Sequence, residues 1–214
     1  PGKLTDLGSP YILRDFRGQA VHVYPFQYNP VTQVLRVYTE ITVEIKSIGD
    51  NGANPFDRYQ PISSFDSEYR NIYSDHFENF LNTRYNALSE QGDMLIICFG
   101  SFMEDMAPFV EWKNMKGIPT EIFDVADIGS NASSIQDFVE YYYNENGLAF
   151  LLLVGDIAQI PSPSVGGSAS DPTYGYIAGN DSYPEVIVGR FSAENSGHVQ
   201  TQVERMLDYE RYPE

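Results

Sequence analysis

The sequence predicts an α/β protein in which a parallel sheet is flanked by helices and preceded by an antiparallel β segment. Two observations lead to this prediction. From Asp93 onward, short apolar runs alternate with amphipathic stretches, and that order of strand and helix is typical of a parallel sheet wrapped by helices. Before residue 50, apolar residues instead recur at every second position, as in antiparallel strands with one buried face.

The antiparallel segment is expected to form a hairpin from about residue 19 to residue 46. In VLRVYTEITVEI (34–45), the odd-numbered residues are mostly apolar, and the even-numbered residues from Arg36 to Glu44 are polar or amphipathic. Upstream, QAVHVYPFQY (19–28) is rich in aromatic residues and reads as extended chain. The residues NPVT (29–32) between them are typical of a turn.

Residues 48–92 lack a regular pattern and mix turn-forming residues with scattered aromatic residues. We interpret them as a linker that packs partly against the domains, because simple linkers seldom contain so many aromatic residues. A short helix is expected near residues 73–82. The basic residue Arg84 in NTRY indicates a candidate proteolytic site, although linkers often contain arginine.

The second part of the chain contains four predicted strands and three predicted helices. The strands are apolar runs of the kind that is buried on both faces of a parallel sheet. They lie at 94–100, 118–125, 148–156 and 185–191. The helices have apolar residues at helical spacing. They cover 103–117, a segment that begins near Ser130, Asn131 or Ser133, and 196–211.

Composition excludes several classes of function. The formal net charge of −17 argues against nucleic-acid binding, because phosphates repel such a surface, but it suits the binding of hard cations. The apolar runs are too short to span a membrane. A single cysteine excludes an internal disulfide. The sequence begins at Pro1 without methionine, so its lack of a signal peptide says little about targeting.

The single cysteine, Cys98, lies in a strand that is predicted to be buried. A thiol in apolar surroundings has a raised pKa and is unreactive. None of the three histidines, His22, His76 and His198, forms a local motif with it. We therefore interpret Cys98 as a core side chain rather than a nucleophile.

Acidic residues follow or precede two of the predicted strands. In GNDSYPEVIVGR (179–190), Asp181 and Glu185 flank a turn, and their carboxylates together with backbone carbonyls would suit calcium. A solvated acidic turn explains the same residues equally well. Asp156 ends a predicted strand, where ligands of open α/β sheets usually bind, although such an aspartate can also cap a turn.

Several stretches together resemble gingipain-type cysteine peptidases, known as family C25. Four stretches resemble the first part of their catalytic domain in order and spacing: FVEWKNMKGIPTEI (109–122), LLLVGDIAQIP (151–161), YGYIAGNDSYPEVIVGRFS (174–192) and QVERMLDYER (202–211). Upstream, residues 11–41 resemble the C-terminal part of the propeptide that precedes these enzymes. The resemblance covers most of the chain.

The resemblance implies a division of the chain into two parts. Residues 1–84 would be the end of a prodomain, and residues 85–214 the first half of a caspase-like α/β catalytic domain. Arg84–Tyr85 matches the junction at which the mature enzyme begins. The protein would then derive from a zymogen, and the resemblance implies a secreted or cell-surface location.

The resemblance also implies where the reactive groups lie. The histidine and cysteine of the family's catalytic dyad come later than residue 214, so neither His198 nor Cys98 takes these roles, and we expect the isolated chain to be inactive. A calcium site before the last strand would use the carboxylates of Asp181 and Glu185 and the carbonyl of Tyr183. Gly179 stands where some relatives have another acid, which would weaken the site.

The resulting hypothesis is the N-terminal part of a cysteine endopeptidase precursor. Its partners would be the rest of the catalytic domain and protein or peptide substrates, without nucleic acid or a membrane span. One alternative is a sortase or transpeptidase of the same family, which would use the same dyad for acyl transfer. The other is a non-catalytic interaction module, in which the hairpin binds a partner.

Overall fold

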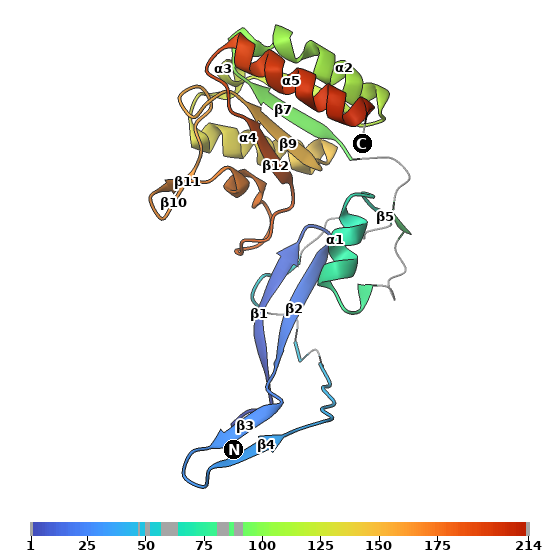
Figure 1. Cartoon of the computed structure of the whole chain (residues 1–214), viewed down its shortest axis with the longest axis vertical. Coiled ribbons are helices and arrows are strands. Elements are labelled where there is room, and N and C mark those ends of the chain that lie inside the picture. Colours follow the sequence, from blue (N-terminus) through green and yellow to red (C-terminus); the bar gives the residue numbers. More distant parts are fainter. Residues whose placement is uncertain are drawn as a thin grey trace.

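The computed structural model describes residues 2–46, 48–49, 52–56, 64–80, 86–87 and 92–212. Figure 1 shows an elongated molecule with a layered α/β unit at one end and two β-hairpins that extend from it toward the other end. We call residues 92–212 the α/β part and the described residues 2–80 the hairpin part.

The α/β part is built on a four-stranded sheet in the order β12-β9-β7-β8, and all three pairings are parallel. The parallel sheet predicted from the sequence is thus confirmed. The strands are β7 (Met94–Cys98), β8 (Thr120–Asp124), β9 (Phe150–Val154) and β12 (Ile187–Phe191). Every residue of β7 is buried, as expected of an apolar run at the centre of a parallel sheet.

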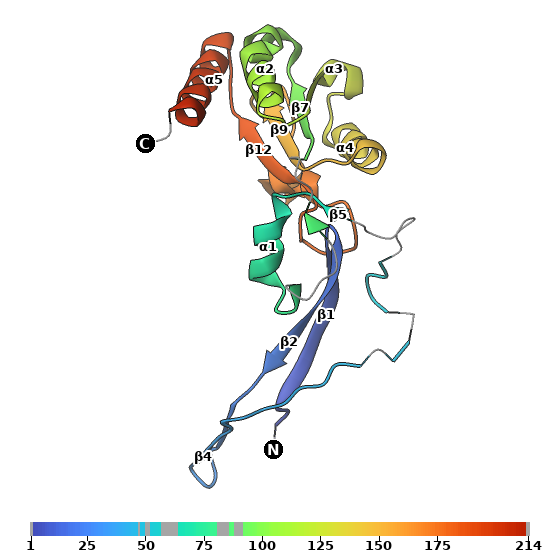
Figure 2. The same cartoon turned by 90° about the vertical axis from the view of Figure 1, so that its right-hand side faces the viewer.

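Helices cover both faces of this sheet. Figure 2 shows α2 (Ala107–Met115) and α5 (Ser196–Arg211) on one side, and α3 (Val125–Ile128) and α4 (Ala132–Asn146) on the other. The side chain of Asn131 accepts a hydrogen bond from the Ser134 N–H group and caps α4. The expected first helix begins later than residue 103, because two 3₁₀ turns, Gly100–Phe102 and Glu104–Met106, precede α2.

Alternate residues of the central strand enter two separate apolar cores. Ile96 and Cys98 pack in the core beneath α2 and α5, whereas Leu95 and Ile97 pack in the core beneath α4. Both cores consist mainly of aliphatic side chains, whose burial is the dominant favourable contribution to folding. None of the described helices is long and apolar enough to cross a membrane.

The hairpin part contains two hairpins where the sequence predicts one. Strand β1 (Thr5–Leu13) pairs with β2 (Phe16–Val23), and β3 (Phe26–Asn29) pairs with β4 (Val34–Val37), all antiparallel. The expected hairpin from residue 19 to 46 therefore needs correction: β2 pairs upstream, and no strand continues over residues 38–46. Pro25 separates β2 from β3 because it has no N–H group to donate.

The region interpreted as a linker contains a packed aromatic cluster. Helix α1 (Tyr69–His76) begins four residues earlier than expected and ends at His76, because the backbone of the next residue, Phe77, is extended. Tyr11, Phe65, Tyr69, Tyr73 and Phe80 are buried together with Ala149 of the α/β part. Short paired strands complete the structure: β5 (Ser64–Phe65) with β6 (Asn86–Ala87), and β10 (Ser164–Val165) with β11 (Ser168–Ala169).

Candidate functional site: the contact between the hairpin part and the α/β part

Arg14 occupies the tip of the first hairpin, where that tip meets the α/β part. Leu13 pairs with Phe16, so Arg14 and Asp15 form a two-residue turn. Arg14 has a φ of +45°, a left-handed conformation that costs free energy in residues other than glycine. Both residues are buried, which is unusual for charged residues of a turn. A strained and buried cation of this kind indicates a functional contact.

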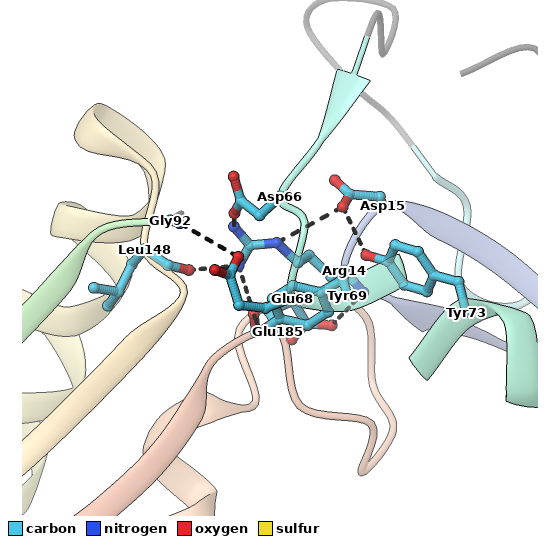
Figure 3. A network of polar contacts seen from close by, with 9 residues as sticks. All are labelled: Arg14, Asp15, Asp66, Glu68, Tyr69, Tyr73, Gly92, Leu148 and Glu185. Carbon is cyan, nitrogen blue, oxygen red and sulfur yellow. Dashed lines mark hydrogen bonds and ion pairs between the residues drawn. The ribbon is translucent and has the colours of Figure 1, made fainter. Parts of the chain in front are cut away.

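The guanidinium group of Arg14 joins the two parts of the chain (Figure 3). Its Nη1 atom donates to the carbonyl oxygens of Leu148 and, at 2.6 Å, of Glu185, both in the α/β part. Its Nη2 atom donates to the carboxylate of Asp66, and Nε lies 3.7 Å from Asp15 Oδ2. The α/β part thus supplies neutral acceptors, and the hairpin part supplies negative charge.

Aromatic side chains surround the same cation. Its Cζ atom lies 4.5 Å from the ring centre of Tyr69 and 5.3 Å from that of Tyr143. The Tyr69 hydroxyl donates to the Glu185 carbonyl at 2.6 Å, and the Tyr73 hydroxyl donates to Asp15 at 2.6 Å. Burial, more than any neighbouring charge, raises the pKa of both hydroxyls above the ordinary tyrosine value, so they remain hydrogen-bond donors.

Burial raises the pKa of Asp66, although the charge of Arg14 opposes this effect. Near this network, the N–H group of Gly92 donates to a carboxylate oxygen of Glu68 at 3.3 Å. The contact between the two parts therefore combines a buried polar network with the aromatic cluster that includes Ala149. Such networks specify one arrangement because each unsatisfied group would cost free energy.

The acidic loop predicted to bind calcium holds strand β1 in this structure. Glu185 is completely buried; its Oε1 accepts from the Arg14 N–H group, and Oε2 accepts from the N–H groups of Ile177 and Ala178. Burial raises the pKa of Glu185, and these three hydrogen bonds oppose the rise. Asp181 Oδ2 accepts from the Ile12 N–H group at 2.9 Å.

The loop residues Asp181, Tyr183 and Glu185 lie together, but their oxygens already have donors. Besides Ile12, the Asn54 side chain donates to Asp181 Oδ2, and the Tyr183 N–H group donates to Oδ1. Among the described residues, no group of three or more His, Cys, Asp and Glu side chains could hold a metal ion. An ion here would have to replace hydrogen bonds of β1, so the calcium site stays a prediction.

Cys98 has the surroundings of a core side chain. It is completely buried in the core beneath α2 and α5. Burial, with smaller contributions from Asp124 and Asp105, raises the pKa of its thiol to about 12. At neutral pH almost no thiolate forms, and the thiolate is the nucleophilic form.

The other sequence candidates have structural neighbours. Ser192 donates to the Asp156 side chain at 3.2 Å, just after β12. His76 lies 2.8 Å from the Tyr11 hydroxyl, and His198 contacts Asn195 at the start of α5. The proposed processing site Arg84–Tyr85 lies outside the described residues.

Sequence reasoning missed the residue at the centre of this contact. Arg14 and Asp15 interrupt a run of apolar residues, which is the usual pattern of an exposed turn. The one local feature that distinguishes this turn from an ordinary exposed turn is that it contains two charged residues and no Gly, Asn or Pro. Its partners Leu148 and Glu185 are distant in the sequence, so no local pattern links them to Arg14.

Comparison with known protein families gives two matches that together cover most of the chain. The profile of "Propeptide_C25" matches residues 1–73, and that of "Peptidase family C25" matches residues 87–214. Gingipain R2 of Porphyromonas gingivalis is 42% identical over 99% of this chain, which spans 29% of that protein. Lys-gingipain of the same species is 28% identical over 98% of this chain, which spans 12% of that protein.

Two solved structures resemble the chain in fold as well as in sequence. A complex of the pro- and mature domains of RgpB from Porphyromonas gingivalis is 43% identical, with a TM-score of 0.54, over 55% of this chain and 29% of the other. The Arg-specific cysteine proteinase gingipain R is 42% identical, with a TM-score of 0.54, over 55% of this chain and 28% of the other.

Proposed function

Since the chain belongs to peptidase family C25, we propose that it is the N-terminal part of a gingipain-like cysteine endopeptidase precursor. Residues 1–84 are the end of the propeptide, and residues 85–214 are the first half of the catalytic domain. The observation that carries this proposal is the succession of a propeptide match and a peptidase match within one chain. A secreted or cell-surface location is part of the proposal, by analogy with the gingipains.

The complete enzyme would cleave peptide bonds with a thiolate activated by histidine. The thiolate attacks the peptide carbonyl, histidine transfers the proton to the leaving amine, and water then hydrolyses the thioester. Backbone N–H groups would stabilise the oxyanion. The dyad would lie beyond residue 214, so this chain contributes structure rather than reacting groups.

The described sheet offers a place for the rest of the catalytic domain. Strand β12 is an edge strand of the described sheet and pairs with β9 on one side. An unpaired strand edge readily pairs with another strand. The next part of the catalytic domain would extend the sheet along β12, with the carboxyl ends of the strands facing the substrate.

Processing provides the direct test of the zymogen. The two profile matches leave residues 74–86 between them, and that interval contains Arg84–Tyr85. We expect the incubated full-length precursor to yield a product that begins at Tyr85, as read by N-terminal sequencing. A product that begins elsewhere would contradict the junction. Loss of hydrolysis with retained acyl transfer to an added amine would instead favour the transpeptidase alternative.

In this proposal, calcium binds to the processed enzyme, from which the propeptide has dissociated. Asp181 Oδ2 and Glu185 Oε1 accept hydrogen bonds from residues that the propeptide would carry away, namely Ile12, Asn54 and Arg14. These two oxygens would then be free to bind a hard cation together with the Tyr183 carbonyl. In the processed enzyme, a chelator should lower the melting temperature, and Asp181→Ala should abolish that effect. An equal melting temperature with and without chelator would remove the site.

A further inference from the structure

A groove lies between α4 and the loop that follows β9. Gln136 and Glu140 of α4 line one wall, and they face the same side of the helix because they are four residues apart. Thr173 and Tyr176, in and just after the 3₁₀ turn Asp171–Gly175, line the other wall. The groove has a volume of about 390 Å³, near the lower end of the range for ligand sites in proteins.

Three side chains of this groove offer hydrogen-bond acceptors. Within the described residues, the Oε1 atom of Gln136 is buried and accepts no hydrogen bond, which costs free energy in the folded chain. Thr173 donates its hydroxyl proton to Ser170 Oγ at 2.8 Å, which leaves the Thr173 oxygen as an acceptor. Glu140 adds a carboxylate at an exposed position. A ligand that fits the groove must therefore supply hydrogen-bond donors.

The surroundings of the groove favour a positively charged ligand. From residue 117 to residue 189 the sequence contains no lysine, arginine or histidine, although aspartate and glutamate occur throughout this stretch. The basic residues on either side of it are already paired, Lys116 with Glu210 and Arg190 with Asp171. A cleft in a surface of one sign concentrates groups of the opposite charge.

The acceptors suit an organic cation better than a metal ion. Glu140 is the one carboxylate that lines the groove, whereas calcium takes about six to eight oxygen ligands and usually several carboxylates. A guanidinium or ammonium group instead carries its own N–H donors. The ring of Tyr176 lines the same groove, and aromatic rings attract such cations.

The position of the groove indicates which molecule brings the cation. Helix α4 follows β8 by way of α3, and the wall with Thr173 and Tyr176 belongs to the loop after β9. Both walls therefore come from connections that leave the carboxyl ends of parallel strands, where ligands of open α/β sheets usually bind. An extended polypeptide that lies across this edge can place a side chain in the groove.

We propose that the groove between α4 and the turn Asp171–Gly175 is a subsite for a positively charged side chain, arginine or lysine, of a polypeptide substrate. The side chain lies away from the peptide bond that is cleaved, because the catalytic domain continues along β12 and the groove lies beside α4. The identity of the polypeptide as a substrate rests on the proposed function. The binding of the cation depends only on the described residues.

A binding experiment tests the groove without any peptidase activity. The isotope-labelled chain is titrated with the capped peptide Ala-Ala-Arg-Ala-Ala, and with versions that carry lysine or leucine in place of arginine, while NMR spectra are recorded. The two cationic peptides should shift the signals of the Gln136 side-chain amide and the Thr173 N–H group, and should bind at least about fivefold more tightly than the leucine peptide. Equal binding of all three peptides, or shifts that avoid these two groups, would overturn the proposal.

Matched variants locate the contact. Glu140→Gln should weaken binding of the cationic peptides at least about threefold. Glu145→Gln makes the same change at an exposed position of α4 that does not line the groove, and should leave binding nearly unchanged. Equal effects of the two substitutions would show attraction by the acidic surface in general, and would overturn the assignment of the groove.

Gln136→Met tests the unpaired acceptor. This variant has a side chain of similar size and lacks the buried oxygen, so its melting temperature should equal or exceed that of the wild-type chain while its binding of the cationic peptides falls. A purely structural role of Gln136 predicts the reverse. A lower melting temperature with unchanged peptide binding would overturn the role of Gln136 as a ligand.

Kinetics of the processed full-length enzyme connect the groove to catalysis. A series of substrates shares one cleavable bond and carries a single arginine, lysine or alanine at successive positions away from that bond. At one position the two cationic residues should lower KM without changing kcat, and Glu140→Gln should remove the difference. An equal KM at every position would overturn the role as a substrate subsite. Absence of hydrolysis of every substrate would overturn the proposed function instead, and the peptide titration would still decide whether the groove binds a cation.

Discussion

The two parts of the molecule bury their apolar side chains in opposite ways. The α/β part encloses two mainly aliphatic cores between a sheet and its helices. The hairpin part has one mainly aromatic cluster, next to the α/β part, and that cluster includes Ala149 of the α/β part itself. We infer that the α/β part supplies most of its own stability, whereas the hairpin part depends on the contact.

The distal hairpin shows the difference most clearly. Phe26 pairs with Val37 and Tyr28 with Leu35, which places four apolar side chains on one face of the β3–β4 ribbon. All four are more than half exposed. A two-stranded ribbon without a covering layer is marginally stable in water, so its shape depends on what packs against it.

The first prediction, which has the largest expected effect, compares one substitution in each part of the molecule. Ile97→Ala, in the core beneath α4, should lower the free energy of unfolding by about 2–5 kcal/mol because it leaves a cavity. Leu35→Ala, on the exposed ribbon face, should change it by less than about 0.5 kcal/mol. Urea unfolding followed by the fluorescence of Trp112, the single tryptophan, measures both. A similar loss of unfolding free energy in both variants would contradict the inferred difference between the two parts.

The second prediction concerns pH. Although burial opposes it, hydrogen bonds from Lys113, Lys116 and Trp112 lower the pKa of Glu210 to about 2. A group with a lowered pKa stabilises the fold above its unfolded pKa, and this contribution disappears as the pH falls from about 5 to 2. We expect roughly 2–3 kcal/mol to be lost in this window.

Asp66 and Glu185, at the contact, have raised pKa values, so their contributions have the opposite sign. The free energy that their charged forms cost at neutral pH is recovered as the pH falls. Urea midpoints at pH 7, 5 and 3, in wild type and in Glu210→Gln, separate the two effects. The variant should show a flatter pH dependence, and parallel curves would exclude Glu210 as the cause.

The third prediction concerns a buried hydrogen bond at the contact between the hairpin part and the α/β part. Tyr73→Phe removes the hydroxyl that donates to the buried Asp15 carboxylate, and should cost about 1–3 kcal/mol. Tyr28→Phe makes the same change at an exposed position of β3 and serves as the control. Thermal unfolding of the full chain measures both. Equal melting temperatures for Tyr73→Phe and Tyr28→Phe would show that the hydrogen bond from Tyr73 to Asp15 contributes little to stability.

The smallest effect is expected for the cysteine. Cys98→Ala should cost about 1 kcal/mol through lost packing in the core beneath α2 and α5. Under the proposed function, the peptidase activity of the full-length precursor after processing should remain nearly intact. Since the thiol pKa is about 12, iodoacetamide at pH 8 should label Cys98 far more slowly in the folded chain than in urea. Loss of activity in a folded Cys98→Ala enzyme would contradict the core assignment.

The α/β part was predictable because its signals are local. Apolar runs such as those of β7 and β9 reflect burial on both faces of the sheet, and one of the three proposed capping residues, Asn131, does cap α4. Strand β1 was missed because its sequence contains Gly8 and Pro10 and lacks a regular alternation. Strand β1 pairs with β2, but Ile12 and Arg14 also bond to the distant residues Asp181 and Glu185, and such partners leave no trace in a short window of sequence.

The bond between the Arg14 N–H group and Glu185 spans 171 residues of chain. Contacts with so large a sequence separation form late, since the chain must pay the entropy of closing a long loop before the contact stabilises it. During synthesis, the tip of the first hairpin leaves the ribosome long before its acceptors exist. The sheet of the α/β part must therefore form before the tip of the first hairpin can pack against it. We expect the docking of Arg14 to be one of the last steps of folding.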